Sequence, residues 1–545
     1  MASTLINQFY KWEKETPHQL FLRQPIDGKW HNYTYSQAGA DIRKMATALR
    51  ALKLPAESNI AILSKNCAHW IMADLAIMMA GYVSVPIYPT LSAHAIQHIL
   101  EHSQSKAIFL GKLDDYSKQK DGVPDSIIKI SFPIYGPNEG IAWSELVKNN
   151  IAMMDQVVAP DAVATIMYSS GTTGTPKGVM LTYKAYDFFG TEAKENFGIH
   201  KPENFFSYLP LSHIAEKAYI ETSVFYTGSS ISFTESLDKF AQNLQEVQPV
   251  LFGGVPRIYA KLQEGVLSKL SQTKLDFLFA IPGVSGIIKK TIRKKIGLNN
   301  AKVVVCGSAP IPVSLLKWYK KLGINIWEIY GMTENCGYSH GDHGQEFHFG
   351  TVGRHWPKVE AKISSEGEIL IKHGALMKGY YKDPETTASV FTEDGFLKTG
   401  DKGTIDADGF LTITGRMKDQ FKTDKGKFIA PAPIEMKLLK NEDIDQVCVV
   451  GMGIPQPIAL VVLSVLGKAK SRSTISAELA AQLEEVNAEL EPYEKLKKVV
   501  VVHSDWTIEN GLLSPTLKVK RYEVEKIHLP NYPLWYKERE TVLWE

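Results

Sequence analysis

The segment "YSSGTTGTPKGVM", residues 168–180, places three glycines, several hydroxyl side chains and one lysine between apolar runs. Glycine lets the backbone approach a ligand closely, and N–H groups, hydroxyls and an ammonium are donors suited to a polyanion. The segment does not have the spacing of the Walker A motif, which requires a glycine directly before the lysine. The pattern indicates a phosphate loop of another type, and a Gly/Thr-rich turn with a chance lysine is the plain alternative.

Further segments support the phosphate-loop interpretation, because they resemble a known set of motifs in the same order. In chain order they are "AGYVSVPIYP", the phosphate loop, "YLPLSHIAEK", "GGVPRIY", "GSAPIP", "EIYGMTE", "KTGD", "GRMKDQFKTDKGKFIAP" and "NGLLSPTLKVKR". The chain resembles, over nearly its whole length, the adenylate-forming superfamily of acyl-CoA synthetases, luciferases and peptide-synthetase adenylation domains. Within that superfamily it is most similar to bacterial long-chain fatty acid–CoA ligases.

This resemblance implies a nucleotide site, with ATP, Mg²⁺ and coenzyme A as cofactors or cosubstrates. The residues implied for the phosphates are Ser170, Gly171, Thr172, Thr173, Gly174 and Lys177. Those implied for the base and its surroundings are Gly307, Ser308, Ala309, Pro310, Tyr330, Gly331, Met332 and Thr333. Asp401 and Arg416 are implied for the ribose, and Glu334 with Thr173 for Mg²⁺, which prefers hard oxygen ligands.

The resemblance also implies the catalytic and substrate residues. Lys518 is expected to neutralise charge between the carboxylate and the α-phosphate, and Thr173, Glu334 and His213 complete the catalytic set. Lys520 and Arg521 lie close by, so the choice of Lys518 rests on the resemblance alone. The acyl pocket is expected at His213, Gly254 and Tyr259, where Tyr259 stands at the gate position that long-chain relatives often fill with Trp. That departure leaves the preferred chain length open.

Three residues of the C-terminal part are implied in a rotation of a lid domain. Lys418 occupies the hinge position, Gly426 belongs to the loop that lines the pantetheine tunnel in relatives, and Lys422 is a candidate contact in the second pose. A lid that serves adenylation in one pose and thioester formation in the other is a hinge-type rearrangement.

The elements that position these residues predict an α/β fold. Short apolar runs such as "NIAIL", "YVSVPIY", "KVVVC" and "INIWEIY" alternate with helical patterns, which favours parallel sheets covered by helices on both faces. Short strands and Gly-Asp turns indicate a β-rich subdomain over about 355–416. We expect a large N-terminal domain, residues 1–416, and a small mobile α+β lid, residues 417–545.

Composition excludes several other classes. The net charge of +2, from 61 basic and 59 acidic residues, gives no field that would gather nucleic acid. Four scattered cysteines and no signal-like N-terminus favour a reduced, cytoplasmic protein, acting as a monomer or homodimer. The basic, apolar segment 276–297 is more typical of a solvated helix face, and contact with the inner face of a membrane is the second interpretation. The set His340, Asp342, His343 and His348 is spaced too irregularly for a metal-site prediction.

The predicted function is ATP-dependent activation of a medium- to long-chain fatty acid to acyl-AMP, followed by thioester formation with coenzyme A. One alternative is delivery of the acyl group to a carrier-protein thiol or another acceptor. The other is a regulator that binds nucleotide or acyl-AMP without catalysis, although Lys177, Glu334, Asp401, Arg416 and Lys518 are all present.

Overall fold

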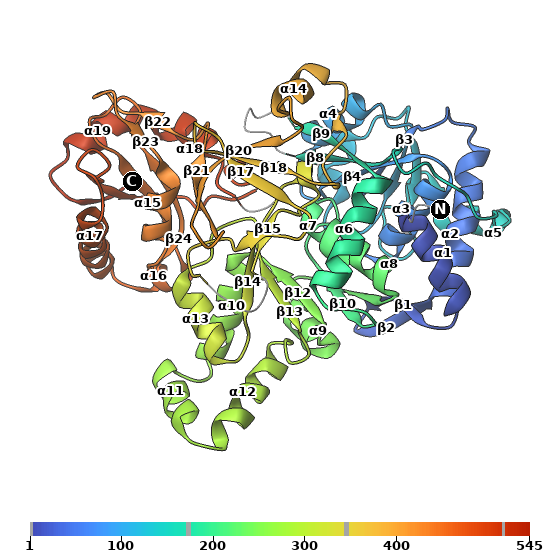
Figure 1. Ribbon diagram of the computed structural model, residues 1–545, viewed down its shortest axis with the longest axis horizontal. Coiled ribbons are helices and arrows are strands. Elements are labelled where there is room, and N and C mark those ends of the chain that lie inside the picture. Colours follow the sequence, from blue (N-terminus) through green and yellow to red (C-terminus); the bar gives the residue numbers. More distant parts are fainter. Residues whose placement is uncertain (1–3, 170–175, 343–347, 509, 515–517) are drawn as a thin grey trace.

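The computed structural model describes residues 4–169, 176–342, 348–508, 510–514 and 518–545, and Figure 1 shows their arrangement. A large body occupies the centre and right of the view, and the C-terminal elements form a smaller unit at the left. The predicted class, a large α/β domain with a small C-terminal domain, is confirmed.

The largest sheet has eight strands in the order β19-β9-β8-β4-β3-β5-β6-β7. Its strands are β3 (Asn59–Leu63), β4 (Val83–Ile87), β5 (Ala107–Leu110), β6 (Ile128–Ser131), β7 (Ile141–Ala142), β8 (Val163–Ser169), β9 (Lys177–Thr182) and β19 (Gly379–Tyr380). The pairs from β8 to β7 are parallel, whereas β9 and β19 join in antiparallel fashion. The sheet is therefore mixed, and β8 and β9 are the antiparallel strands on either side of the predicted phosphate loop.

Helices cover this sheet as the alternating pattern predicts. They include α1 (Leu5–Glu15), α2 (Tyr35–Ala51), α3 (Ala68–Met79), α4 (Ala93–Ser103), α5 (Trp143–Asn149) and α6 (Tyr183–Asn196). Every residue of α3 is buried, as expected for a helix that is apolar all round.

Two further sheets complete the α/β part. One has the order β10-β11-β1-β2, with β10 (Asn204–Ser207), β11 (Ser230–Phe233), β1 (Leu20–Ile26) and β2 (Lys29–Thr34). The other has the order β12-β13-β14-β15-β16, with β12 (Leu251–Gly254), β13 (Val303–Cys306), β14 (Ile326–Tyr330), β15 (His340–Gly341) and β16 (Arg354–His355). Because β12, β13 and β14 are parallel, the segments after Gly254, Cys306 and Tyr330 meet at one edge of the sheet.

A buried charged cluster fixes the segment between β10 and β11. Nζ of Lys217 lies 2.5 Å from Oδ2 of Asp74 on α3 and 2.9 Å from Oε2 of Glu221. Burial acts to lower the pKa of Lys217, but the two carboxylates outweigh it and the pKa is raised. Lys217 opens the π-helical turn η3 (Lys217–Thr222), which also carries Tyr219. Such turns are frequent at functional sites.

The β-rich subdomain is an antiparallel sheet in the order β17-β18-β20-β21. Its strands are β17 (Glu360–Ile363), β18 (Glu368–Lys372), β20 (Leu397–Ile405) and β21 (Leu411–Arg416). Helix α14 (Pro384–Val390) lies between β18 and β20 in the chain.

The C-terminal unit begins with the hairpin of β22 (Phe421–Lys422) and β23 (Phe428–Ile429). Its sheet has the order β24-β25-β26-β27, with β24 (Ile444–Val450), β25 (Ile458–Leu463), β26 (Val499–Val501) and β27 (Val542–Trp544). Its helices are α15 (Pro431–Leu438), α16 (Val465–Ala469), α17 (Arg472–Ala488), α18 (Arg521–His528) and α19 (Tyr532–Lys537). Leu411 still packs in the core of the body, whereas Phe421 packs in the core of this unit.

Candidate active site

A carboxylate, a guanidinium and a phenol meet on the β-rich subdomain. The register of β20 and β21 pairs Asp401 with Arg416, and Nε of Arg416 lies 3.1 Å from Oδ1 of Asp401. Tyr330, at the end of β14, donates from Oη to Oδ2 of Asp401 over 2.7 Å. Asp401 is buried, and each of its oxygens keeps a further lone pair beyond the contact it already makes. This geometry leaves Asp401 able to accept from ligand hydroxyls, as the sequence predicted for a ribose.

Two turns beside this pair require glycine. A Cβ on Gly307, just after β13, would lie 2.9 Å from Cγ1 of Ile329. A Cβ on Gly331, just after β14, would lie 2.5 Å from the carbonyl carbon of Gly337. Ser308 adopts a φ of 69°, a left-handed conformation that few side chains favour. The predicted base-binding segments therefore pass close to other backbone at the edge of the β12–β14 sheet, with Ala309, Pro310, Met332 and Thr333 next to these turns in the chain.

Glu334 lies in a buried position that the sequence predicted for a magnesium ligand. Its Oε1 accepts a hydrogen bond from Oη of Tyr380 over 2.9 Å. Burial raises the pKa of Glu334, opposed by hydrogen bonding and by Arg416. Burial thus disfavours the ionised carboxylate, and a bound cation would offset this cost. The carboxylate therefore fits a divalent metal that takes oxygen ligands.

Tyr380 contacts Lys177 as well as Glu334. The pairing of β19 with β9 brings Tyr380 beside the start of β9, and Nζ of Lys177 lies 5.0 Å from the ring centroid of Tyr380. Tyr380 is a residue of this candidate site that sequence reasoning missed. The signal was the tyrosine pair in "KGYYKD", which carries no motif chemistry until the strand pairing is known. The predicted phosphate residues Ser170, Gly171, Thr172, Thr173 and Gly174 lie outside the described residues.

His213 is held in one neutral tautomer at the start of helix α7 (Ile214–Glu216). The backbone N–H of Ala215 donates to its Nδ1 over 3.2 Å. Burial, and secondly the charge of Lys518, lowers the pKa of His213 to about 4. A neutral ring with Nδ1 as acceptor carries its proton on Nε2. His213 can therefore donate a hydrogen bond to a carboxylate or a phosphate oxygen.

An apolar pocket opens next to His213, with free space of about 50 Å³. Its lining is mostly apolar and includes Leu209, His213, Ile214, Tyr219, Ile220, Gly254, Val255, Val305 and Ile329. The turns at Gly307 and Gly331 also line it, so the pocket adjoins the predicted nucleotide segments. The π-helical turn η3 supplies Tyr219 and Ile220.

The predicted gate residue Tyr259, on α10 (Pro256–Leu267), lies behind Gly254. A Cβ on Gly254 would come within 2.9 Å of the Tyr259 ring. Tyr259 has no exposed surface, and its Oη donates to the carbonyl oxygen of Val305 over 2.7 Å. The ring therefore packs behind Gly254, which lines the pocket.

Lys518, in the C-terminal unit, interacts electrostatically with residues of this site. Its backbone N–H donates to Oγ of Ser514 over 3.0 Å. Its side chain is exposed to solvent, yet the surrounding protein, followed by the charge of Arg416, lowers the pKa of Lys518 to about 8, and Asp401 acts in the opposite direction. The charge of Lys518 also contributes to the lowered pKa of His213.

The two neighbouring cations differ in their surroundings. Lys520 immediately precedes α18. Arg521 is held inside the C-terminal unit, where it donates to Glu435 over 2.6 Å and to the carbonyl oxygen of Val449 over 2.5 Å. The choice of Lys518 over Lys520 stays a prediction.

The pKa of Lys518 gives a prediction for pH. The useful form is the ammonium, which predominates below a pKa of about 8 and is lost as the pH rises through that value. Acid-dependent pyrophosphate release, measured as kcat/KM for ATP, is expected to fall above that pH. Lys518→Arg keeps its charge to much higher pH, so this variant should be slower but lose the alkaline decline. An alkaline decline unchanged in Lys518→Arg would assign it to another group.

The predicted lid residues Lys418, Lys422 and Gly426 lie in the turn before β22 and on the β22–β23 hairpin. Lys418 is exposed in the turn between β21 and β22, at the junction of the two cores. Nζ of Lys422 lies 5.6 Å from the ring centroid of Phe428, across the β22–β23 hairpin. Gly426 adopts a φ of 77° in the turn of that hairpin. Their predicted roles concern a second pose of the lid and remain predictions.

Together, the fold and the site define an adenylate-forming enzyme architecture. Residues 9–381 match the model of the AMP-binding enzyme family, and residues 418–526 match that of the AMP-binding enzyme C-terminal domain. The chain belongs to the AMP-binding enzyme family.

Individual relatives agree with this assignment. The long-chain-fatty-acid–CoA ligase FadD15 of Mycobacterium bovis is 28% identical over 94% of this chain and 93% of that protein. The o-succinylbenzoate CoA synthetase MenE of Bacillus subtilis, solved with an acyl-adenylate, matches 95% of this chain and 98% of its own, at a TM-score of 0.75 and 24% identity. The adenylation domain of a carboxylate reductase from Mycobacterium chelonae matches 98% of this chain and 91% of its own, at a TM-score of 0.80 and 22% identity.

Proposed function

We propose that this chain is a fatty acid–CoA ligase, which activates a medium- to long-chain acid with Mg²⁺ and ATP and transfers the acyl group to coenzyme A. The observation that carries the proposal is the buried Asp401, paired with Arg416 and Tyr330 in an arrangement that suits a ribose, together with the apolar pocket that His213 and Gly331 line. The charge of Lys518 interacts with Arg416, Asp401 and His213. The relative FadD15, named as a long-chain-fatty-acid–CoA ligase and matched over 93% of its length, supports the same substrate class.

In the first step the acid attacks the α-phosphate of ATP and pyrophosphate leaves. Asp401 binds the ribose and Lys177, with the loop before it, binds the distal phosphates. Nε2–H of His213 orients the attacking carboxylate. The ammonium of Lys518 stabilises the charge that gathers on the α-phosphate, which is the main requirement of such transfers. Glu334 and Thr173 would hold Mg²⁺, which neutralises phosphate charge when bound.

In the second step the thiol of coenzyme A attacks the acyl-adenylate and AMP leaves. We propose that the chain divides into domains 1–416 and 417–545, and that the second rotates about Lys418. The separate cores that contain Leu411 and Phe421 support this division. Rotation removes Lys518 and turns the hairpin with Lys422 and Gly426 toward the acyl group.

Substrate size is linked to Tyr259. The Tyr259 ring packs against Gly254, which lines the pocket, so a movement of this ring would enlarge the pocket. We propose that longer acids displace this ring and break its hydrogen bond to Val305, in exchange for buried methylene surface.

A survey of acids tests the substrate class. AMP release from ATP is measured with and without coenzyme A for acids from acetate to oleate, benzoate and amino acids. Fatty acids of roughly eight to eighteen carbons should have the highest kcat/KM, because each buried methylene contributes up to about 0.8 kcal/mol. Sustained turnover should require coenzyme A. Acetate or benzoate as the best substrate would contradict the proposed pocket, and turnover only with a carrier protein would indicate the alternative acceptor.

A further inference from the structure

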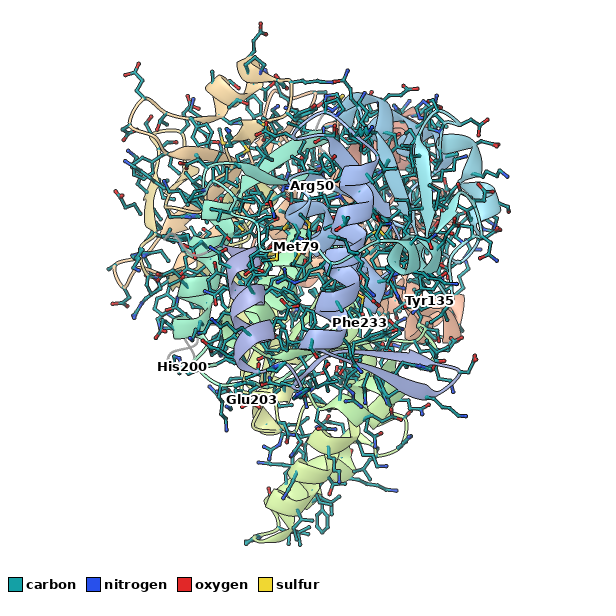
Figure 2. All side chains as sticks on the ribbon, turned by 90° about the vertical axis from the view of Figure 1, so that its right-hand side faces the viewer. Arg50, Met79, Tyr135, His200, Glu203 and Phe233 are labelled. Carbon is teal, nitrogen blue, oxygen red and sulfur yellow. The ribbon has the colours of Figure 1, made fainter. Side chains whose placement is uncertain are left out.

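The helices α11 (Gln272–Ala280) and α12 (Val284–Lys295) form a hairpin that projects from the body at the bottom of Figure 1. Figure 2, turned by 90°, shows the same green hairpin extending below the body. The sequence pattern indicates one amphipathic segment here, whereas the structure divides the region into two helices at Pro282 and Gly283. The projection is a distinct structural element with two outer surfaces and a tip.

Contacts at one side hold the hairpin in a fixed orientation. Leu275 and Ile292 are buried in the core that lies against α13 (Val313–Lys321). Trp318 donates from Nε1 to Gln272 over 3.1 Å, and Lys321 lies 2.9 Å from Asp276. The opposite side is therefore presented to the surroundings in a defined way.

Apolar and basic side chains alternate on that opposite side. Phe277 is 68% exposed and Ile287 is 67% exposed. On α12, Lys290 and Lys294 follow Ile287 at intervals of three and four residues, which places all three on one helix face. Lys274 precedes Phe277 by three residues on α11. We call Lys274, Phe277, Ile287, Lys290 and Lys294 the outer face of the hairpin.

The charge of the hairpin differs from that of the whole chain. Residues 269–295 contain seven basic residues and one acidic residue, although the net charge of the chain is only +2. The tip, residues 277–288, has the sequence "FLFAIPGVSGII" and carries no charge. Lys274 precedes this tip, and Lys289 and Lys290 follow it. An uncharged tip between basic flanks suits a surface that is apolar inside and anionic at its boundary.

We propose that the hairpin docks on the surface of an anionic lipid bilayer. The tip enters the boundary between headgroups and acyl chains, and the lysines of the outer face contact lipid phosphates. Charge complementarity and the exposed Phe277 and Ile287 specify this partner, because amphipathic helices bind membranes through these two contributions. No helix among the described residues is long and apolar enough to cross a membrane.

Membrane docking of the hairpin is a property separate from the proposed ligase reaction. One consequence rests on the proposed function: docking would bring the acyl pocket close to the phase in which water-insoluble acids accumulate. Binding itself needs no substrate, so its test is independent of catalysis.

Vesicle flotation of the full chain, without ATP, acid or coenzyme A, tests the proposal. Wild-type protein should bind vesicles of phosphatidylcholine with about 30% phosphatidylglycerol, bind pure phosphatidylcholine much less, and lose affinity with salt. The double variant Lys290→Glu with Lys294→Glu should weaken vesicle binding at least about tenfold, because each basic residue close to an anionic surface contributes to the free energy of binding. The control pair Lys106→Glu with Lys148→Glu makes the same charge change at exposed sites on the body and should stay within about twofold.

A depth measurement keeps the test independent of the charge variants. All four native cysteines are buried, so Ile287→Cys provides a selective site for an environment-sensitive fluorophore. Emission should shift to the blue on anionic vesicles, and the same fluorophore on Lys148→Cys should not shift. Absence of wild-type binding to the anionic vesicles would overturn the proposal. So would equal loss in both charge variants, or a hairpin variant that changes only self-association in sedimentation.

Discussion

Lys518→Ala is expected to reduce acid-dependent pyrophosphate release by at least about 10²–10³-fold, because a preorganised donor and its full charge are both removed from the developing negative charge. ATP binding should persist, since Asp401, Tyr330 and Lys177 remain in place. Pyrophosphate release in a single turnover, together with equilibrium binding of ATP, measures the two properties separately.

The matched control is Lys520→Ala, which removes a neighbouring lysine of the same loop region. It should retain most of the activity, because Lys520 lies outside the charge interactions that connect Lys518 with Arg416, Asp401 and His213. Supplied with synthetic acyl-adenylate and coenzyme A, Lys518→Ala should still form thioester. Activation of fatty acids at the wild-type rate by Lys518→Ala would show that another lysine acts, with Lys520 the next to examine.

Lys418→Pro is expected to separate the two half-reactions. Proline fixes φ and removes the backbone N–H at the junction between the two cores, so rotation of the lid should be hindered. Pyrophosphate release in a single turnover should survive, while thioester formation from acyl-adenylate should collapse. Rapid-quench experiments measure the rate of adenylation and the rate of thioester formation, and the ratio of the two rates shows whether the variant separates them.

Lys418→Ala controls for loss of the side chain, because Lys418 is exposed and alanine leaves φ free. This variant should perform both half-reactions close to the wild-type rates. If Lys418→Pro slows adenylation and thioester formation equally, residue 418 is not the pivot.

Much of the fold was predictable because its elements repeat a strong local pattern. The apolar window ending in "VSVPIYP" forms the buried helix α3 and the strand β4, as expected for a helix and strand buried on all sides. The strand β27 carries no such local pattern. It has only three residues and pairs with β26 across the intervening helices α18 and α19, so no local periodicity marks it.

The candidate site residues were assigned from motifs, whereas their contacts with one another were not predictable. The resemblance implies one ribose for Asp401 and Arg416, and the register of β20 and β21 shows why these two residues meet. Tyr380 was missed because a two-residue strand, β19, brings it to Lys177 and Glu334 from a distant part of the chain. The packing of Tyr259 against Gly254 is a further contact that motif order does not reveal.

Isotope transfer tests the central claim, attack of the carboxylate on the α-phosphate, most directly. The wild-type protein is incubated with ATP, coenzyme A and decanoate that carries oxygen-18 in both carboxylate oxygens, and the phosphorus products are analysed by mass spectrometry. One labelled oxygen should appear in each AMP, with none in pyrophosphate. Label in inorganic phosphate with ADP as the nucleotide product, or AMP without label, would contradict an acyl-adenylate intermediate.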